Sequence, residues 1–261
     1  MQAWVTSQKH MATNCFPVVR LCEKAGRIYL DVLREIHCTR KDVAALTLSL
    51  NQDEWIVSGL GSGILVNNKY LALIKRDAGA PSNPSLWTIT SGLLEDVREL
   101  TNKFAMYREA FEELWVRANG QLLKPKFQES PLNQMVFDTF VILQKNFPEV
   151  AISEGSFLAR PVILDSFDHL DISGVTYRAI VQRFLPKKTI NILGLIHYEI
   201  DSDVSYEDGE YEVLGNGEKS RLQRTVKLFS KSELAKIDHS LVTPHASEII
   251  RKIIQEGAIN D

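Results

Sequence analysis

The stretch that decides how this chain is interpreted is Arg108-Glu109-Ala110-Phe111-Glu112-Glu113. At about 100° per residue, its three glutamates fall within an arc of roughly 100° on one side of a helix, which we expect over residues 104–117. Three carboxylates this close repel one another, and a hard divalent cation commonly relieves the repulsion. The pattern therefore allows two interpretations, a metal site or the acidic outer face of an ordinary surface helix.

The residues before this helix predict short strands. Apolar runs at 63–66 and 70–76 flank the turn Asn67-Asn68, which predicts a hairpin, and a strand bearing Trp87 follows before Gly92. The glycine-rich run 59–63 precedes a strand instead of following one and opening a helix, so it does not match a dinucleotide fingerprint. We interpret that run as a flexible entry into the first strand.

This order of hairpin, Trp-bearing strand, glycine and acidic helix resembles the Nudix hydrolases, whose signature reads G-x5-E-x7-R-E-U-x-E-E-x-G-U, with U a bulky aliphatic residue. The pairs Arg108-Glu109 and Glu112-Glu113 match in register, and Gly92, Glu99 and Val116 are the nearest matches to the first glycine, the first glutamate and the last aliphatic. The loop half departs from the signature, because six residues separate Gly92 from Glu99 and eight separate Glu99 from Arg108. Ala110 and Trp115 stand where an aliphatic residue and the second glycine are expected.

The resemblance implies an α/β (α+β) fold, the Nudix-type α/β/α sandwich with a mixed β-sheet. It also implies Mg²⁺-dependent (or Mn²⁺-dependent) hydrolysis of a diphosphate linkage in a nucleoside diphosphate derivative, by attack of water on phosphorus. Such a site needs cations more than a covalent nucleophile.

The same resemblance assigns roles to individual residues. The metal ligands would be the main chain of Gly92 and the carboxylates of Glu99, Glu109, Glu112 and Glu113. The catalytic residues would be Glu112, Glu113 and Arg108, with Arg108 holding a carboxylate through an i,i+4 pair. Lys75 and Arg76, at the end of the second predicted strand, are candidates to bind the substrate's phosphates.

Two other functions stay open. The chain could be a catalytically silent Nudix-like domain that binds a ligand or regulates, since Trp115 and the lengthened loop could reshape the pocket. It could also be an enzyme of the isopentenyl-diphosphate isomerase type, which shares the fold but uses a pocket cysteine. An unrelated α+β interaction protein is the remaining alternative.

Composition limits the partners. The 261 residues carry a net charge of −3, which gives no reason to expect general attraction to nucleic acid, although a capped RNA end stays open. No apolar run approaches the roughly 20 residues of a membrane span. Cys15, Cys22 and Cys38 are odd in number and show no C-x-x-C spacing, which indicates a reducing compartment, so we expect a cytoplasmic protein. The expected partner is a small-molecule nucleoside diphosphate derivative.

The chain divides by pattern into an N-terminal extension at 1–55 and a Nudix-like domain at 56–261, with an insertion at about 145–188. The extension carries a predicted hairpin over 18–33, which must pack on the main sheet or form a homodimer because so small a hairpin cannot stand alone. We further expect a short helix at 42–50 and strands at 134–143 and 189–200. Near the end, Ser230 to Glu233 is a capping box, Asn216-Gly217 favours a hairpin, and Thr243-Pro244 opens a final helix.

Overall fold

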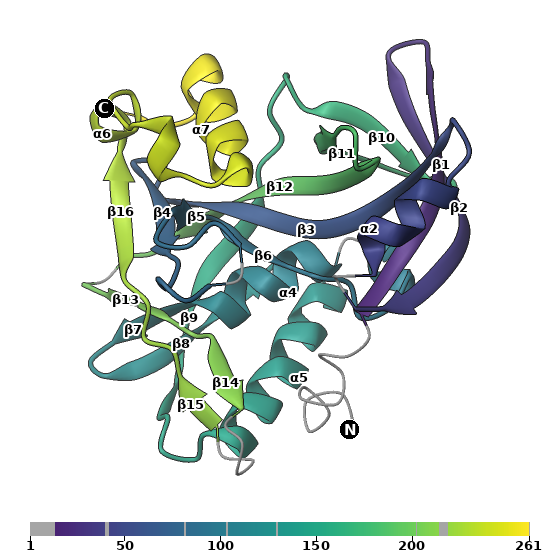
Figure 1. Cartoon of the computed structure of the whole chain (residues 1–261). Coiled ribbons are helices and arrows are strands. Elements are labelled where there is room, and N and C mark those ends of the chain that lie inside the picture. The colour runs from purple at the N-terminus through teal and green to yellow at the C-terminus, as the bar shows by residue number, and fades with distance from the viewer. Residues whose placement is uncertain are drawn as a thin grey trace. The chain divides into compact units, whose positions relative to one another are not determined.

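The computed structural model describes residues 14–39, 42–80, 82–102, 104–128, 130–201, 203–213 and 219–260. The chain forms two compact units that interleave along the sequence. Figure 1 labels the helices and strands from which they are built. Unit 1 is drawn from Met1–Gly61, Ser91–Met106 and Phe167–Gly194, and unit 2 from Ser62–Thr90, Tyr107–Ser166 and Leu195–Asp261. Two long strands, β3 (Glu54–Val66) and β12 (Thr189–Glu199), contribute residues to each unit. The boundary expected at residues 55 and 56, and the insertion at about 145–188, stay predictions.

Unit 1 is built mainly of strands. Their order is β12-β11-β10-β2-β1-β3, and a further pairing between β12 and β3 joins the two ends of this order. The pair β10–β2 is parallel, and the pairs of β1 with β2, of β1 with β3, of β10 with β11 and of β11 with β12 are antiparallel. Besides β3 and β12, the elements are β1 (Asn14–Lys24), β2 (Arg27–Cys38), α2 (Val43–Leu46), η1 (Thr47–Ser49), β6 (Thr90–Gly92), α3 (Arg98–Asn102), β10 (Asp168–Ile172) and β11 (Val175–Phe184).

The predicted N-terminal hairpin is present as β1 and β2. The tight turn between them uses Ala25 and Gly26, both with positive φ (50° and 71°). Strand β1 pairs with β3 from Val18 to Arg20, and β2 pairs in parallel with β10. The hairpin therefore packs on a sheet, as expected, while a role in forming a homodimer stays a prediction. The short helix expected at 42–50 is confirmed by α2 and η1.

The larger apolar core of unit 1 lies between its strands and the segment after Gly92. Its buried side chains come from most of the strands and include Val19, Leu30, Val57, Leu170, Ala179 and Ile192. Leu94 and Leu100, from the segment that also carries Glu99, join this core. The Tyr177 hydroxyl donates a hydrogen bond to the Leu100 carbonyl at 3.2 Å. The segment after Gly92 is therefore anchored to the core of unit 1.

Unit 2 combines strands with longer helices. Two runs of paired strands, β13-β7-β8-β9-β12 and β3-β4-β16, occur there, with β5 on β4. The hairpin predicted at Asn67-Asn68 is confirmed, since both asparagines have positive φ (51° and 54°) between β3 and β4. The elements are β4 (Tyr70–Lys75), β5 (Trp87–Thr88), α4 (Phe104–Glu113, from Tyr107 on), β7 (Leu114–Ala118), β8 (Gln121–Phe127), α5 (Ser130–Asn146), β9 (Ile152–Pro161), β13 (Ser205–Asp208), β14 (Tyr211–Val213), β15 (Lys219–Arg221), β16 (Val226–Ser230), α6 (Lys231–Leu234), η2 (His239–Leu241) and α7 (Pro244–Glu256).

The two helix starts predicted near the end of the chain are confirmed. The Ser230 side chain accepts a hydrogen bond from the Glu233 N–H, and Glu233 accepts one from the Ser230 N–H, so the capping box is confirmed. Thr243 caps α7, with Pro244 at its first position, also as predicted. The predicted turn at Asn216-Gly217 lies outside the described residues, but β14 and β15 on either side of it do pair.

The glycine-rich run is not a flexible strand entry, because it lies inside β3. A Cβ added at Gly63 would come within 2.7 Å of an Ile249 side-chain carbon on α7 and 2.9 Å of one on Leu195. Glycine therefore lets the closing helix pack directly on this strand.

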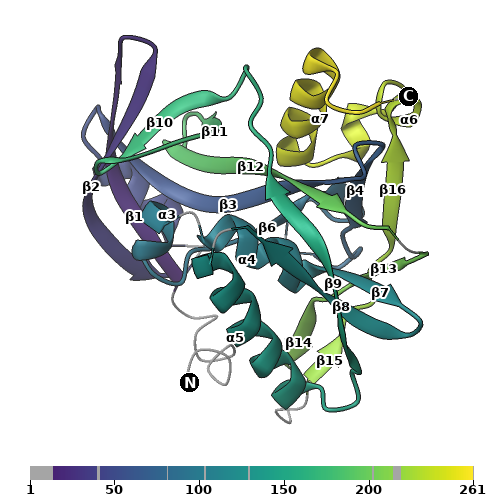
Figure 2. The same ribbon diagram turned by 180° about the vertical axis from the view of Figure 1, so that it is seen from behind.

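The strand predicted at 134–143 is wrong, because these residues form the middle of α5, which lies beside β8 (Figure 2). Leu132, Val136 and Phe140 recur every four residues and are buried, as on a helix. Phe137 and Val141 are 57% and 52% exposed, and these two exposed apolar residues made the run look like a continuous strand.

The helix predicted over 104–117 is too long, because α4 ends at Glu113. The chain continues as β7, where Leu114 to Arg117 pair with Ser205 to Asp208 of β13. Trp115 and Val116 favour strand by their side-chain shape, and a partner strand 90 residues later decides the outcome.

Antiparallel and parallel pairs both occur, and helices accompany the strands, so the predicted mixed α+β fold with a mixed sheet is confirmed. Among the described residues, no helix is long and apolar enough to cross a membrane.

Candidate functional site

The three glutamates of α4, called here the acidic cluster (Glu109, Glu112 and Glu113), are largely withdrawn from solvent. Glu109 is 8% exposed and Glu113 is 9% exposed, and Glu112 is half-buried. The same turns of the helix bury Ala110 and Phe111. An ordinary surface helix would turn its carboxylates to water, so burial on both sides of α4 disagrees with that interpretation.

Arg108 forms ion pairs with two members of the acidic cluster. Its Nη1 lies 3.0 Å from Oε1 of Glu109 and donates a hydrogen bond to Oε2 of Glu112, also at 3.0 Å. All three side chains are 11 to 13% exposed, so water screens these ion pairs less than it screens surface pairs. The i,i+4 pair expected for Arg108 is present, and it restricts the side chain of Glu112.

Glu113 has a different arginine, which comes from far along the chain. Nη2 of Arg224 lies 3.7 Å from Oε1 of Glu113. The guanidinium is itself held by Asp208, with Nε donating to Oδ2 at 2.9 Å and Nη2 to Oδ1 at 2.8 Å. Asp208 also accepts from the main-chain N–H of Arg224 at 2.9 Å. This bidentate pair is buried, with side chains 0% and 6% exposed, and fixes the arginine beside Glu113.

Burial opposes the positive charge of Arg224, but the hydrogen bonds that it donates to Asp208 and the negative charges of Glu210, Glu113 and Asp208 outweigh this effect and raise the pKa of the guanidinium. Burial also raises the pKa of Glu210, and the positive charge of Arg224 partly offsets this rise. Arg224 is therefore surrounded by the buried carboxylates of Asp208 and Glu113 and the partly exposed one of Glu210, and removing Asp208 leaves a buried charge without its closest partner.

Gly209 allows β13 to approach the end of α4. Its N–H donates to the Glu113 carbonyl at 2.9 Å, and a Cβ at this position would lie 2.1 Å from the Glu112 carbonyl oxygen. Only glycine fits such an approach. The close contact places Asp208 and Glu210 next to the C-terminal turn that carries Glu113.

Trp115, which stands where the Nudix signature has glycine, is a packing residue in β7. It is 2% exposed, and the guanidinium of Arg221 lies 4.3 Å from the centre of its ring. Arg221 also donates to the Asp208 carbonyl at 2.9 Å. Trp115 in place of the signature's second glycine therefore fits this fold, because its side chain is buried in β7, the strand that follows the helix.

The candidate phosphate-binding residues also lie in unit 2. Lys75 is exposed, with its ammonium 5.8 Å from the centre of the Trp87 ring. Nε of Arg76 donates to the Ser82 carbonyl at 3.1 Å, and the charge of Arg76 opposes the rise in the pKa of Glu210.

The loop half of the predicted site belongs to unit 1. Gly92 ends β6, and the Glu99 carboxylate accepts a hydrogen bond from the Glu95 N–H at 2.9 Å. The structure thus brings together Arg108, Glu109, Glu112 and Glu113 within α4, while Gly92 and Glu99 stay predicted ligands.

Sequence reasoning missed Asp208, Gly209, Glu210 and Arg224. Asp208-Gly209 is a turn-forming pair that could have indicated a tight approach at this point. Nothing local distinguishes Arg224 from other arginines, because only the fold brings it to Glu113.

Comparison with solved structures found similar folds at low identity. A MutT protein from Methanosarcina mazei Go1 is 9% identical, with a TM-score of 0.38, over 77% of this chain and 94% of that one. Nudix hydrolases from Nitrosomonas europaea and Alicyclobacillus acidocaldarius are 15% and 10% identical, each with a TM-score of 0.38. They cover 91% and 76% of this chain, and 86% and 91% of their own.

No protein-family model matches the chain, and no curated protein matches it in sequence. The names of the solved structures belong to those proteins and say nothing of this chain's substrate or activity.

Proposed function

We propose that this protein is a Nudix-type hydrolase that cleaves a diphosphate linkage in a nucleoside diphosphate derivative with Mg²⁺ or Mn²⁺. The observation that carries the proposal is the burial of Glu109 and Glu113 beside Glu112 on one helix. Burying several carboxylates is costly, and a fold keeps such a group where it has a use for the charge.

The donor set fits the proposed metal. Glu109, Glu112 and Glu113 offer only carboxylate oxygens, the ligands that Mg²⁺ and Mn²⁺ prefer. When bound, the metal would supply positive charge to the phosphate oxygens of the substrate. The main chain of Gly92 and the carboxylate of Glu99 are the further ligands that the sequence resemblance implies.

The surrounding residues have separate roles in this proposal. Glu112, held by Arg108, accepts the proton of the attacking water, since a positioned carboxylate can serve as a general base. Arg224, held by Asp208, fixes the position of Glu113. Lys75 and Arg76 bind the phosphates of the substrate.

The ion pairs also favour a second candidate, a catalytically silent domain that binds a ligand. Arg108 and Arg224 already provide positive charge to all three carboxylates, which is what a bound cation would do. In a silent domain these arginines replace the metal, and the protein stays stable without it. A cytoplasmic location, on the ground of three free cysteines, belongs to either proposal.

The two candidates separate in one experiment on the full chain. The melting temperature is measured with and without Mg²⁺ or Mn²⁺, and release of phosphate-bearing products is measured on a panel of nucleoside diphosphate derivatives. The variant Glu113→Gln keeps the size of the side chain and removes its charge. Glu149→Gln, which changes an exposed glutamate of the same unit, is the matched control.

For the hydrolase we expect metal-dependent stabilisation and turnover in the wild type. Both should be lost in Glu113→Gln, with turnover falling by about 10²-fold or more, and both should be kept in Glu149→Gln. A wild type with neither response supports the silent domain. Full turnover in Glu113→Gln would show that the site lies elsewhere.

A further inference from the structure

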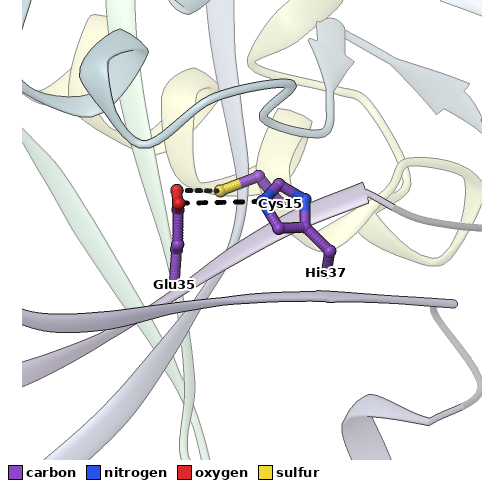
Figure 3. Close-up of side chains that lie close together, drawn as sticks. All are labelled: Cys15, Glu35 and His37. Atoms are coloured by element: carbon purple, nitrogen blue, oxygen red, sulfur yellow. Dashed lines mark hydrogen bonds and ion pairs between the residues drawn. The ribbon is translucent and has the colours of Figure 1, made fainter.

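A second group of metal-ligating side chains lies on the N-terminal hairpin of unit 1. In the β1–β2 register, Cys15 pairs with His37 and Pro17 with Glu35. Residues 35 and 37 lie on one face of β2, because alternate residues of a strand share a face. Figure 3 shows the side chains of Cys15, Glu35 and His37 converging from the two strands. We call these three residues the thiol cluster.

The distances within the thiol cluster are short. The Cys15 thiol donates a hydrogen bond to Oε2 of Glu35 at 3.7 Å. Nε2 of His37 lies 3.8 Å from Oε1 of Glu35. One possible ligand atom from each residue, a sulfur, an oxygen and a nitrogen, lies within 4.8 Å of the other two.

These separations approach those of a tetrahedral metal site. Zinc binds cysteine sulfur at about 2.3 Å and histidine nitrogen or carboxylate oxygen at about 2.0–2.2 Å. Ligand atoms at tetrahedral angles then lie roughly 3.5 Å apart. Rotamer adjustments of Glu35 and His37, both exposed, would bring the three atoms to that spacing.

We propose that Cys15, Glu35 and His37 form a binding site for Zn²⁺ or a divalent cation of similar softness. Sulfur, nitrogen and oxygen together make a borderline-soft donor set, which suits zinc and does not suit magnesium. The backbone is fixed there, because the Cys15 N–H donates a hydrogen bond to the Leu94 carbonyl at 3.0 Å and Cys15 pairs with His37 between β1 and β2.

The charges around the cluster favour a cation. The negative charges of Glu35, Asp96 and Glu99 act on the Cys15 thiol. A water molecule would supply the fourth ligand of a zinc site.

A reactive nucleophile is the other use of a cysteine beside a histidine, and the surroundings oppose it. Burial, followed by the charge of Glu35, raises the pKa of Cys15 to about 12. A nucleophilic cysteine requires the opposite environment, one that stabilises the thiolate. Bound metal supplies the positive charge that this environment lacks.

The test uses Co²⁺, which takes tetrahedral sites as zinc does, on the full-length reduced protein. We expect one equivalent of Co²⁺ to give thiolate-to-cobalt charge-transfer absorption, and one equivalent of Zn²⁺ to remove it. Glu35→Gln and His37→Gln change exposed side chains, so the protein should stay folded and lose Co²⁺ affinity by about tenfold or more. Cys15→Ser should abolish the charge-transfer band.

Two matched controls locate the signal. Cys22→Ser changes an exposed cysteine of the same strand and should leave the band unchanged. Glu113→Gln should also leave it unchanged, because the acidic cluster has no sulfur. No thiolate band in the wild type, or a band that survives Cys15→Ser, would overturn the proposal. Unchanged affinity in both Glu35→Gln and His37→Gln would do the same, whatever the outcome for the proposed hydrolase.

Discussion

The acidic cluster and the thiol cluster hold their charges in opposite ways. In the acidic cluster, the carboxylates of one helix meet guanidinium groups, and Asp208 holds one of those arginines from a buried position. In the thiol cluster, one exposed carboxylate meets a thiol and an imidazole across two strands. Arginines of the same chain compensate part of the charge of the first, and the second gathers donors of three kinds.

Closely spaced carboxylates alone therefore do not identify a metal site. Hard oxygen donors suit Mg²⁺ and Mn²⁺, and a set with sulfur and nitrogen suits zinc. Ion pairs with arginine lower the need of the acidic cluster for a cation. A cation at the acidic cluster would compete with the ion pairs that Arg108 and Arg224 form with the same carboxylates.

The largest effect should come from breaking the buried pair that supports the acidic cluster. Asp208→Asn leaves Arg224 buried without its bidentate partner, and we expect the free energy of unfolding to fall by about 3–5 kcal/mol. Urea denaturation measures the loss. Glu207→Gln, next to it and 39% exposed, is the control and should cost about 0–1 kcal/mol. Equal losses in both variants would mean that the pair around Arg224 has no special importance.

The two clusters should also respond to different metals. At a concentration 100 times its dissociation constant, a bound metal stabilises the folded state by about 2.7 kcal/mol. We expect Mg²⁺ to raise the melting temperature of the wild type and of Glu35→Gln, but not of Glu113→Gln. Zn²⁺ should raise that of Glu113→Gln, but not of Glu35→Gln. One variant that loses both responses would show that the clusters are not separate sites.

Alkylation of the cysteines should distinguish Cys15 from Cys22. Cys15 is 1% exposed and its pKa is raised to about 12, so near pH 8 it stays a protonated, inaccessible thiol. Cys22 is exposed. We expect iodoacetamide to label Cys22 at least about tenfold faster, as read by peptide mass spectrometry. In urea the two rates should become similar, and a fast Cys15 in the folded protein would contradict the described burial.

The smallest effect concerns the charge beside the thiol cluster. Arg98 pairs with Asp96 at 2.6 Å, and its positive charge also faces Glu35. Arg98→Gln removes a cation near the proposed zinc site, so Co²⁺ should bind a few-fold more tightly. Because Arg98 is 82% exposed, the gain should disappear in high salt. Weaker binding in Arg98→Gln at low salt would mean that the arginine positions the cluster.

Local chemistry explains the parts of the fold that the sequence predicts well. The Asn67-Asn68 turn, the Ser230–Glu233 capping box and Thr243-Pro244 each depend on residues a few positions apart. Their hydrogen bonds and backbone preferences are made within the segment, so they survive in any fold. The acidic face of α4 is equally local, which is why the sequence could indicate Glu109, Glu112 and Glu113.

The failures have the opposite cause. Residues 134–143 are rich in apolar side chains, and only packing shows that Val136 faces the interior while Phe137 does not. The helix predicted to reach residue 117 ends at Glu113 because β13 offers a partner to β7. At residues 134–143 and 114–117, packing against other segments decides between helix and strand, because the local preferences of these residues are weak.

By itself, the sequence determined that this chain has a mixed α+β fold and that three carboxylates lie on one helix. Only the tertiary structure decided that Glu109 and Glu113 are buried, and that Arg224 and Asp208 stand beside them. Only it brought Cys15 within reach of Glu35 and His37, some 20 residues later on the next strand. The physical reason is that the periodicity of a helix depends on residues a few positions apart, whereas burial and ion pairing depend on which distant segments pack together.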